Sequence, residues 1–129
     1  MKGVLLVNLG TPESPAPQDV GRYLSEFLSD PRVVDLPRWL WLPLLKLVII
    51  PLRKNRSAEA YRKVWTSEGS PLLVESTRLA EKLRERLKGE AGGEAEVSLA
   101  MRYGSPSVHL GLEELRNQGV EDLVVLPMY

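Results

Sequence analysis

An α/β fold, with a parallel sheet and helices on both of its faces, is the architecture that this sequence predicts. Three apolar runs, residues 4–9, 97–103 and 123–129, have the near-continuous character of strands that are covered on both sides. The intervals between them carry apolar residues at helical spacing, and short turns with Gly and Pro join the elements. With 129 residues, 43% of them hydrophobic, the chain is long enough for one domain with a buried core.

The first strand and the first helix have clear end signals. Gly10, Thr11 and Pro12 end the strand. Ser14 followed by prolines suits the start of a helix, which Asp30 and the next proline end. The apolar positions at helical spacing are Val20, Tyr23, Leu24, Phe27 and Leu28.

Three further helices are predicted. One begins with Ser57 as its N-cap, and the next covers residues 72–88 and is followed by a Gly-rich connector. The last begins with Ser105 and Pro106 as cap and first turn and closes at Gly119. Its expected inner face consists of Val108, Leu112 and Leu115.

The segment from Trp39 to Leu52 is unusually apolar for a small protein, because eleven of its fourteen residues are large and apolar. A helix that spans a bilayer needs about 20 apolar residues, so this run is too short, and Lys46, Pro43 and Pro51 interrupt it. Because Pro disrupts a helix interior, we expect one or two short helical turns with a bend at each Pro. Three interpretations stay open: a buried core segment, a surface that enters a bilayer interface, and the wall of an apolar ligand pocket.

Positive charge coincides with this apolar segment. From Arg38 to Lys63 the chain has seven cationic residues and one acid, a net charge of +6 in a chain whose total charge is zero. Cations beside an apolar surface suit an apolar anion, either an acidic lipid or a hydrophobic carboxylate. Nucleic acid is not an expected partner, because the whole chain is not basic and its basic band is rich in aliphatic residues.

Several classes of site lack support in this sequence. There is no cysteine, which excludes disulfides, thiolate metal sites and a Cys nucleophile within the chain. No P-loop, dinucleotide fingerprint or zinc-protease motif is present, and a single His makes no convincing transition-metal site. We therefore expect no cofactor in this chain. The N-terminus lacks the features of a secretory signal, so we expect a cytoplasmic location, with membrane association through the apolar segment as an addition.

Two motifs have both a structural and a functional interpretation. The turn "NLGTP" could bind an anion through backbone amides, although a plain tight turn is the more usual role of such residues. His109 lies four residues before Glu113 on the last helix. Such a pair could transfer protons, but an i, i+4 pair on an amphipathic helix is more often a surface pair.

The ends of the predicted strands carry candidate ligand contacts. Arg102 and Tyr103 lie at the end of the second strand, and Tyr129 lies at the end of the third. At these positions they either contact a ligand or anchor a loop. Because ligand sites in such sheets form beyond the carboxyl ends of the strands, and the chain stops there, we expect it to be part of a longer protein.

A second group of candidates follows the apolar segment. Arg53, Arg56, Tyr61 and Arg62 are either solvated helix ends or, through their guanidinium groups, a site for carboxylates.

Five blocks of the sequence together resemble the ferrochelatase family. They are "LLVNLGTP", "YLSEFLSDPRVVDLP", "AYRKVWTSEGSPL", "MRYGSPS" and "GVEDLVVLPMY", in the family's order and at about its spacing. The resemblance is closest to bacterial enzymes of the protoporphyrin type and covers essentially the whole chain. It implies a chelatase-like fold of two similar halves, of which residues 1–129 are the first, and the insertion of Fe²⁺ into protoporphyrin IX in the last step of haem synthesis.

The resemblance also implies roles for particular residues. The segment 36–53, which we call the lip, matches the edge of the active-site mouth, and in membrane-associated members this edge contacts the bilayer; here Trp39 and Trp41 would do so. The implied porphyrin contacts are Leu9 at the porphyrin face, Arg53, Arg56 and Ser70 at the propionates, and Tyr61 and Tyr103 at the mouth or pocket.

The resemblance also limits what this chain can do. The family's metal-handling His and its partner Glu lie downstream of residue 129, and His109 does not match that His, so we expect neither catalytic nor metal-binding residues here. Two alternatives stay open: a non-catalytic module that binds porphyrin or membrane, and a chelatase for another tetrapyrrole such as coproporphyrin or sirohydrochlorin.

Overall fold

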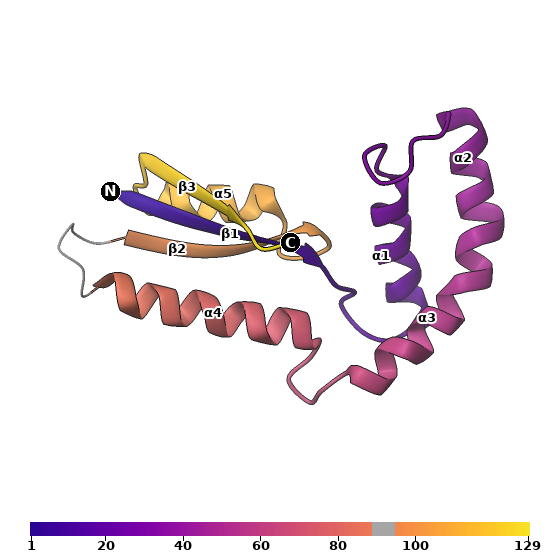
Figure 1. Cartoon of the computed structure of the whole chain (residues 1–129), viewed down its shortest axis with the longest axis horizontal. Helices are drawn as coiled ribbons and strands as arrows, with labels where there is room; N and C mark the ends of the chain where they lie inside the picture. Colours follow the sequence, from indigo (N-terminus) through magenta and orange to yellow (C-terminus); the bar gives the residue numbers. More distant parts are fainter. Residues whose placement is uncertain (89–94) are drawn as a thin grey trace. The chain divides into compact units, whose positions relative to one another are not determined.

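The computed structural model describes residues 1–88 and 95–129, and these form two compact units (Figure 1). Unit 1 consists of Met1–Gly10 and Leu72–Tyr129, and unit 2 of Thr11–Pro71. The elements in chain order are β1 (Lys2–Gly10), α1 (Pro17–Ser29), α2 (Arg38–Leu44), the π-helical segment η1 (Leu45–Ile49), α3 (Ile50–Val64), α4 (Pro71–Lys88), β2 (Ala95–Tyr103), α5 (Val108–Asn117) and β3 (Asp122–Pro127). The predicted Gly-rich connector falls mostly on residues 89–94, outside the described ranges.

Unit 1 contains a three-stranded sheet in the order β2-β1-β3. Both pairs are parallel, and Leu6 of the central strand lies opposite Leu99 on one side and Leu126 on the other. The predicted parallel sheet is therefore confirmed, and all three strands present their carboxyl ends at the same edge.

Helices cover both faces of this sheet, as predicted. On one face Leu5, Val7 and Ala100 pack with Leu115 of α5. On the other face Leu6 and Val97 pack with Ala80 of α4, and Leu83 and Leu87 extend this cluster. Figure 1 shows α4 and α5 on opposite sides of the strands. The two faces follow from the alternation of side chains along each strand.

The strand β3 differs from its neighbours because both of its faces are exposed. Its apolar side chains Leu123, Val124, Val125 and Leu126 each expose between 40% and 55% of their surface. Among the strands of the described ranges, β3 pairs with β1 alone and lies at the edge of the sheet. Its composition is that of a covered strand, so this part of the sheet presents apolar surface and an open backbone edge.

Unit 2 is built from helices. α1 packs against α3 and η1, and Gly21 lies at the crossing, where a Cβ would be 3.6 Å from side-chain atoms of Ile50 and Lys54. The buried residues of the unit are Thr11, Pro12, Val20, Gly21, Tyr23, Trp41, Leu45, Ala58 and Ser70. Tyr23 and Phe27 stack with their ring centroids 6.1 Å apart. Val20 and Tyr23, predicted as inner positions of α1, are thus buried.

The lip is more helical than we predicted from its prolines. Instead of short turns separated by bends, α2, η1 and α3 follow one another without a break. Pro43 lies inside α2 and Pro51 in the first turn of α3, with the wider π-helical turn between them. Pro51 is the second residue of α3 and directly follows the π-helical turn, so the helical run continues through both prolines. Within the described residues, no helix has both the length and the apolarity to cross a membrane.

Two predicted helix starts are wrong. Ser57 lies inside α3 rather than at its N-cap, because the helix already begins at Ile50. The N-cap of α5 is Ser107, whose Oγ accepts a hydrogen bond from the Leu110 amide at 3.1 Å, and not Ser105. On α5, Gly111 and Leu115 are buried, whereas Leu112 is exposed.

Candidate functional site

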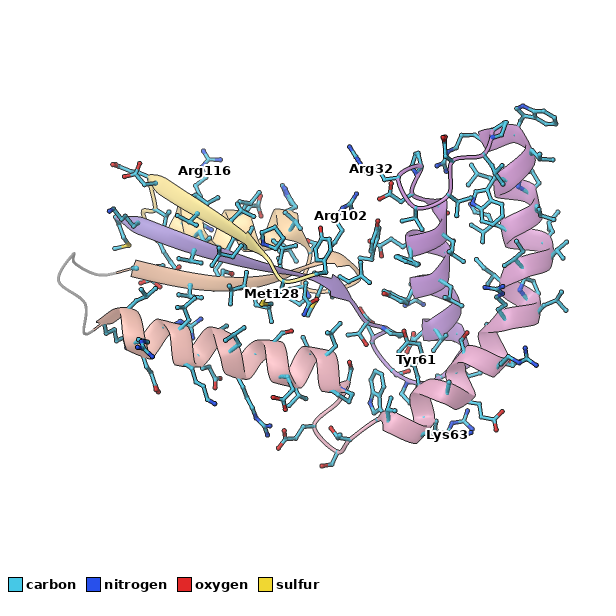
Figure 2. All side chains as sticks on the ribbon, viewed as in Figure 1. Arg32, Tyr61, Lys63, Arg102, Arg116 and Met128 are labelled. Atoms are coloured by element: carbon cyan, nitrogen blue, oxygen red, sulfur yellow. The ribbon has the colours of Figure 1, made fainter. Side chains whose placement is uncertain are left out.

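The carboxyl edge of the sheet brings two predicted contacts, Leu9 and Tyr103, close together. Gly10 is the register partner of Tyr103, so Leu9 lies at the same level of the sheet as the end of β2. Leu9 is half-buried and Tyr103 is buried. The guanidinium of Arg102 lies 4.8 Å from the centre of the Tyr103 ring. Figure 2 shows Arg102 and Met128 at this edge of unit 1. Arg102 and Tyr103 are therefore in contact at the edge where ligands of parallel sheets bind, and the backbone of Leu9 lies beside them.

Gly10 makes this arrangement possible. Its φ is +131°, in a region that side chains disfavour. A Cβ at this position would be 2.0 Å from the carbonyl oxygen of Tyr103. Only glycine allows β1 to leave the sheet this close to the end of β2. Sequence reasoning treated Gly10 as ordinary punctuation and missed this contact.

Asn8 ties the carboxyl end of β1 to α4. Its Nδ2 donates to Ser76 Oγ at 3.1 Å, and its Oδ1 accepts from the Leu9 amide at 2.8 Å. Ser76 is buried. Since buried polar groups need partners, these bonds hold the backbone beside Leu9 in place.

Unit 2 contains a buried pair of hydroxyl groups at the two ends of its chain segment. Thr11 Oγ1 donates to Ser70 Oγ at 2.8 Å, and the two residues expose only 4% and 3% of their surface. A serine hydroxyl that accepts one bond still has its own proton to donate. Ser70 was predicted as a propionate contact, whereas Thr11, within the "NLGTP" motif, was not singled out as a contact.

The cationic candidates lie on α3. Arg53 and Arg56 are one turn apart and exposed. Further along this helix, Tyr61, labelled in Figure 2, meets Trp65 edge-on with ring centroids 6.4 Å apart. Burial raises the pKa of Tyr61 above its usual value of 10.0. A tyrosine phenol is protonated at neutral pH, so Tyr61 can donate a hydrogen bond beside the exposed cations of α3.

The two tryptophans of the lip have opposite environments. Trp39 exposes 78% of its surface and Trp41 only 8%. The indole Nε1 of Trp41 donates to the Leu28 carbonyl at 2.6 Å. Leu47 and Leu52 are also strongly exposed, at 77% and 75%. The outer surface of the lip is thus apolar, and Trp39, not Trp41, belongs to it.

The predicted contacts fall into two sets. Leu9 and Tyr103 belong to unit 1, while Arg53, Arg56, Tyr61 and Ser70 belong to unit 2. Unit 1 supplies an apolar residue and an aromatic residue with the cation Arg102 beside it, and unit 2 supplies two cations, a serine hydroxyl and a second tyrosine.

Other candidates lie apart from these sets. His109 and Glu113 form the expected i, i+4 pair, with Nε2 and Oε1 3.2 Å apart, and both side chains are largely exposed. Over residues 1–88 and 95–129, no three His, Cys, Asp or Glu side chains gather in a way that could hold a metal ion. A hollow of about 280 Å³ lies between α4 and α5, beside Ser98 and Leu99 of β2. It includes none of the predicted contacts.

The sequence of the chain is similar to the sequences of known proteins of one family. The model of the ferrochelatase family matches residues 1–129. The chain is 59% identical over 127 residues to a ferrochelatase from Methylococcus capsulatus, covering 98% of this chain and 37% of the relative. It is 56% identical over 128 residues to a ferrochelatase from Vibrio atlanticus, covering 99% and 38%. A ferrochelatase from Yersinia enterocolitica is 55% identical over 127 residues, with coverage of 98% and 38%. The chain thus spans less than two fifths of the length of these relatives.

Proposed function

This chain belongs to the ferrochelatase family, and from this premise we propose that it is the N-terminal part of an enzyme that inserts Fe²⁺ into a porphyrin. The observation that carries the proposal is the family match over all 129 residues, together with relatives named ferrochelatase at 52–59% identity. The proposed substrate is protoporphyrin IX, and the product is haem, as in the last step of haem synthesis.

In this proposal the present chain contributes to porphyrin binding. A porphyrin of this type is a flat apolar ring with two carboxylates. Apolar surface such as that of Leu9 would cover the ring, with a stabilisation of about 25 cal/mol per Å² removed from water. The exposed guanidinium groups of Arg53 and Arg56 suit the carboxylates, because guanidinium and carboxylate form strong paired hydrogen bonds. Ser70 and Tyr61 would add hydroxyl donors.

The acid–base chemistry is assigned to another part of the enzyme. Insertion of Fe²⁺ releases two protons from pyrrole nitrogens, and a base must accept them while the ring is distorted. The one imidazole of this chain, His109, is exposed on α5 and paired with Glu113. We therefore propose that the residues that accept protons and handle the metal lie downstream, and that residues 1–129 alone do not form haem.

Removal of the two arginines tests the binding role. We expect Arg53→Ala combined with Arg56→Ala to weaken porphyrin binding by the full-length enzyme about tenfold or more, since each charge-assisted hydrogen bond contributes about 1.5–3 kcal/mol. Fluorescence titration with protoporphyrin measures the affinity. The matched control is Lys82→Ala with Arg86→Ala, which removes the same charge from exposed positions of α4. Equal affinity in the two double variants would sink the propionate role.

Substrate choice is a separate question. The full-length enzyme is assayed with Fe²⁺ and each of three tetrapyrroles: protoporphyrin IX, coproporphyrin and sirohydrochlorin. The rate of metal insertion into each is measured. We expect protoporphyrin IX to have the highest kcat/KM. Preference for coproporphyrin would assign the chain to a chelatase for that tetrapyrrole, and metal insertion into none of the three would favour a non-catalytic binding module.

A second function is supported by the surface of the lip. Trp39, Leu47 and Leu52 are exposed, and seven cationic residues lie between Arg38 and Lys63. Apolar side chains flanked by cations are typical of surfaces that enter the interface of an anionic bilayer. We propose peripheral contact between the lip and such a membrane.

A further inference from the structure

Two side chains at the start of the lip donate hydrogen bonds to the last carbonyl groups of α1. Trp41 Nε1 donates to Leu28 O at 2.6 Å, and Arg38 Nη1 donates to Ser29 O. We call this pair of hydrogen bonds the α1 clasp. Both donors lie on α2, three residues apart, and therefore on one face of that helix.

The carbonyl groups at the carboxyl end of α1 require hydrogen-bond donors from outside the helix. The last four carbonyls of a helix have no partner within the helix, and at this end the amide of the cap residue Asp30 donates to Phe27 O at the long distance of 3.4 Å. No basic residue lies in the last turn of α1. Because the carboxyl end of a helix carries partial negative charge, Arg38 supplies from α2 the cation that α1 lacks.

The two donor residues of the clasp differ in how completely their buried N–H groups are paired. Trp41 is 8% exposed, so its indole N–H has little water as an alternative partner. Nη2 of Arg38 is buried, and no acceptor in the described part of the chain reaches it. A buried donor without a partner has a desolvation cost, which opening of the clasp would relieve. Arg38 is therefore the less completely satisfied of the two donor residues.

The clasp also sets which side chains of α2 face outward. With Arg38 and Trp41 directed at α1, Trp39 and Leu40 between them are left exposed, at 78% and 47%. We propose that Arg38 and Trp41 are positioning residues that fix the lip to the carboxyl end of α1 and so determine the apolar surface that the lip presents to the porphyrin. The porphyrin part of this inference rests on the proposed function.

Hydrogen exchange of the full-length enzyme tests the clasp directly. Trp41→Phe removes the indole N–H and retains a smaller aromatic ring, and we expect amides of residues 38–49 to exchange about fivefold faster or more, the effect of one net hydrogen bond together with some lost packing. For Arg38→Met we expect the same amides to exchange about tenfold faster or more, since a charged donor is lost. Arg38→Lys, which keeps a cation, should restore part of the protection. The control Trp39→Phe makes the same ring substitution at the exposed neighbour and should leave exchange unchanged.

Kinetics separate positioning from general loss of stability. We expect Trp41→Phe and Arg38→Met to raise the KM for porphyrin severalfold with kcat unchanged. Wild-type exchange rates in both variants would overturn the clasp, and so would faster exchange that extends equally to α4. Faster exchange confined to the lip with an unchanged KM would support the clasp and contradict the proposed role of the lip in porphyrin binding.

Discussion

At the scale of single residues, two glycines inside helices have different surroundings. A Cβ at Gly21 of α1 would make ordinary contacts of 3.6 Å, whereas a Cβ at Gly111 of α5 would lie 2.9 Å from Leu5 Cδ1 and 3.2 Å from Ala100 Cβ. Gly111 is therefore required by the close packing of α5 on the sheet, and Gly21 is not required by its neighbours.

This difference predicts opposite effects of the same substitution. Gly21→Ala should raise the free energy of unfolding by up to about 1 kcal/mol, because alanine favours a helix interior. Gly111→Ala should lower it by about 1–3 kcal/mol, the usual cost of overpacking a core. Urea unfolding of the two variants measures both effects. A loss of stability at Gly21 equal to that at Gly111 would contradict the packing argument.

The raised pKa of Tyr61 predicts how stability depends on pH. Because burial raises the pKa above 10.0, the folded state holds the phenol proton more tightly than the unfolded state. The stabilisation is fully present below pH 10 and is lost as pH rises through the raised value. We expect the stability of Tyr61→Phe to fall less steeply above pH 10 than that of the wild type in urea unfolding at a series of pH values. Identical pH profiles would show that Tyr61 titrates as an exposed tyrosine.

At the scale of elements, the lip has one buried side and one exposed apolar side. Leu45 and Trp41 are buried against the rest of unit 2, while Trp39, Leu47 and Leu52 are exposed. Of the three interpretations of this segment, the buried-core one describes only its inner side. The outer side is available for a bilayer or a ligand.

The exposed side predicts the effect of a single tryptophan on membrane binding. Trp39→Ser should reduce binding to anionic vesicles about tenfold, since one buried large apolar side chain contributes about 1.5–3 kcal/mol. Co-sedimentation with phosphatidylserine vesicles measures this binding. Leu79→Ser, which changes an exposed leucine of α4, is the control and should have no effect. Undiminished binding by Trp39→Ser would remove the membrane role of the lip and leave the pocket-wall interpretation.

At the scale of the whole molecule, the exposed edge strand β3 predicts self-association of the 129-residue chain. Its apolar side chains are exposed on both faces and its outer backbone groups are open. Such edges pair readily with other chains. The 129-residue chain should therefore self-associate through β3.

A charge on this strand should reduce the association. We expect Val125→Lys to lower the apparent mass of the chain in light scattering at increasing concentration, because charged residues on edge strands oppose pairing. Leu79→Lys introduces the same charge at a leucine of similar exposure on a helix and should change the mass little. An equal reduction in both variants would show that net charge, not the strand edge, controls association.

Local sequence patterns were sufficient for the class of fold. Near-continuous apolar runs predicted the strands, and their alternation with helices predicted a parallel sheet, because strand and helix periodicities depend on neighbouring residues alone. The prediction that every strand is covered is wrong for β3, which is exposed. The blocks from "LLVNLGTP" to "GVEDLVVLPMY" were likewise sufficient to identify the family.

Other features depended on residues far apart in the chain, and only the tertiary structure decided them. Trp39 and Trp41 look equivalent in the sequence, but one is exposed and the other donates to α1. Thr11 and Ser70 bond across 59 positions, and Gly10 is required only because Tyr103 O lies beside it. The sequence by itself therefore determined the class of fold, the three strands and the family. The packed structure decided which side chains face outward and which polar groups meet, because burial and hydrogen bonding depend on neighbours that only folding brings together.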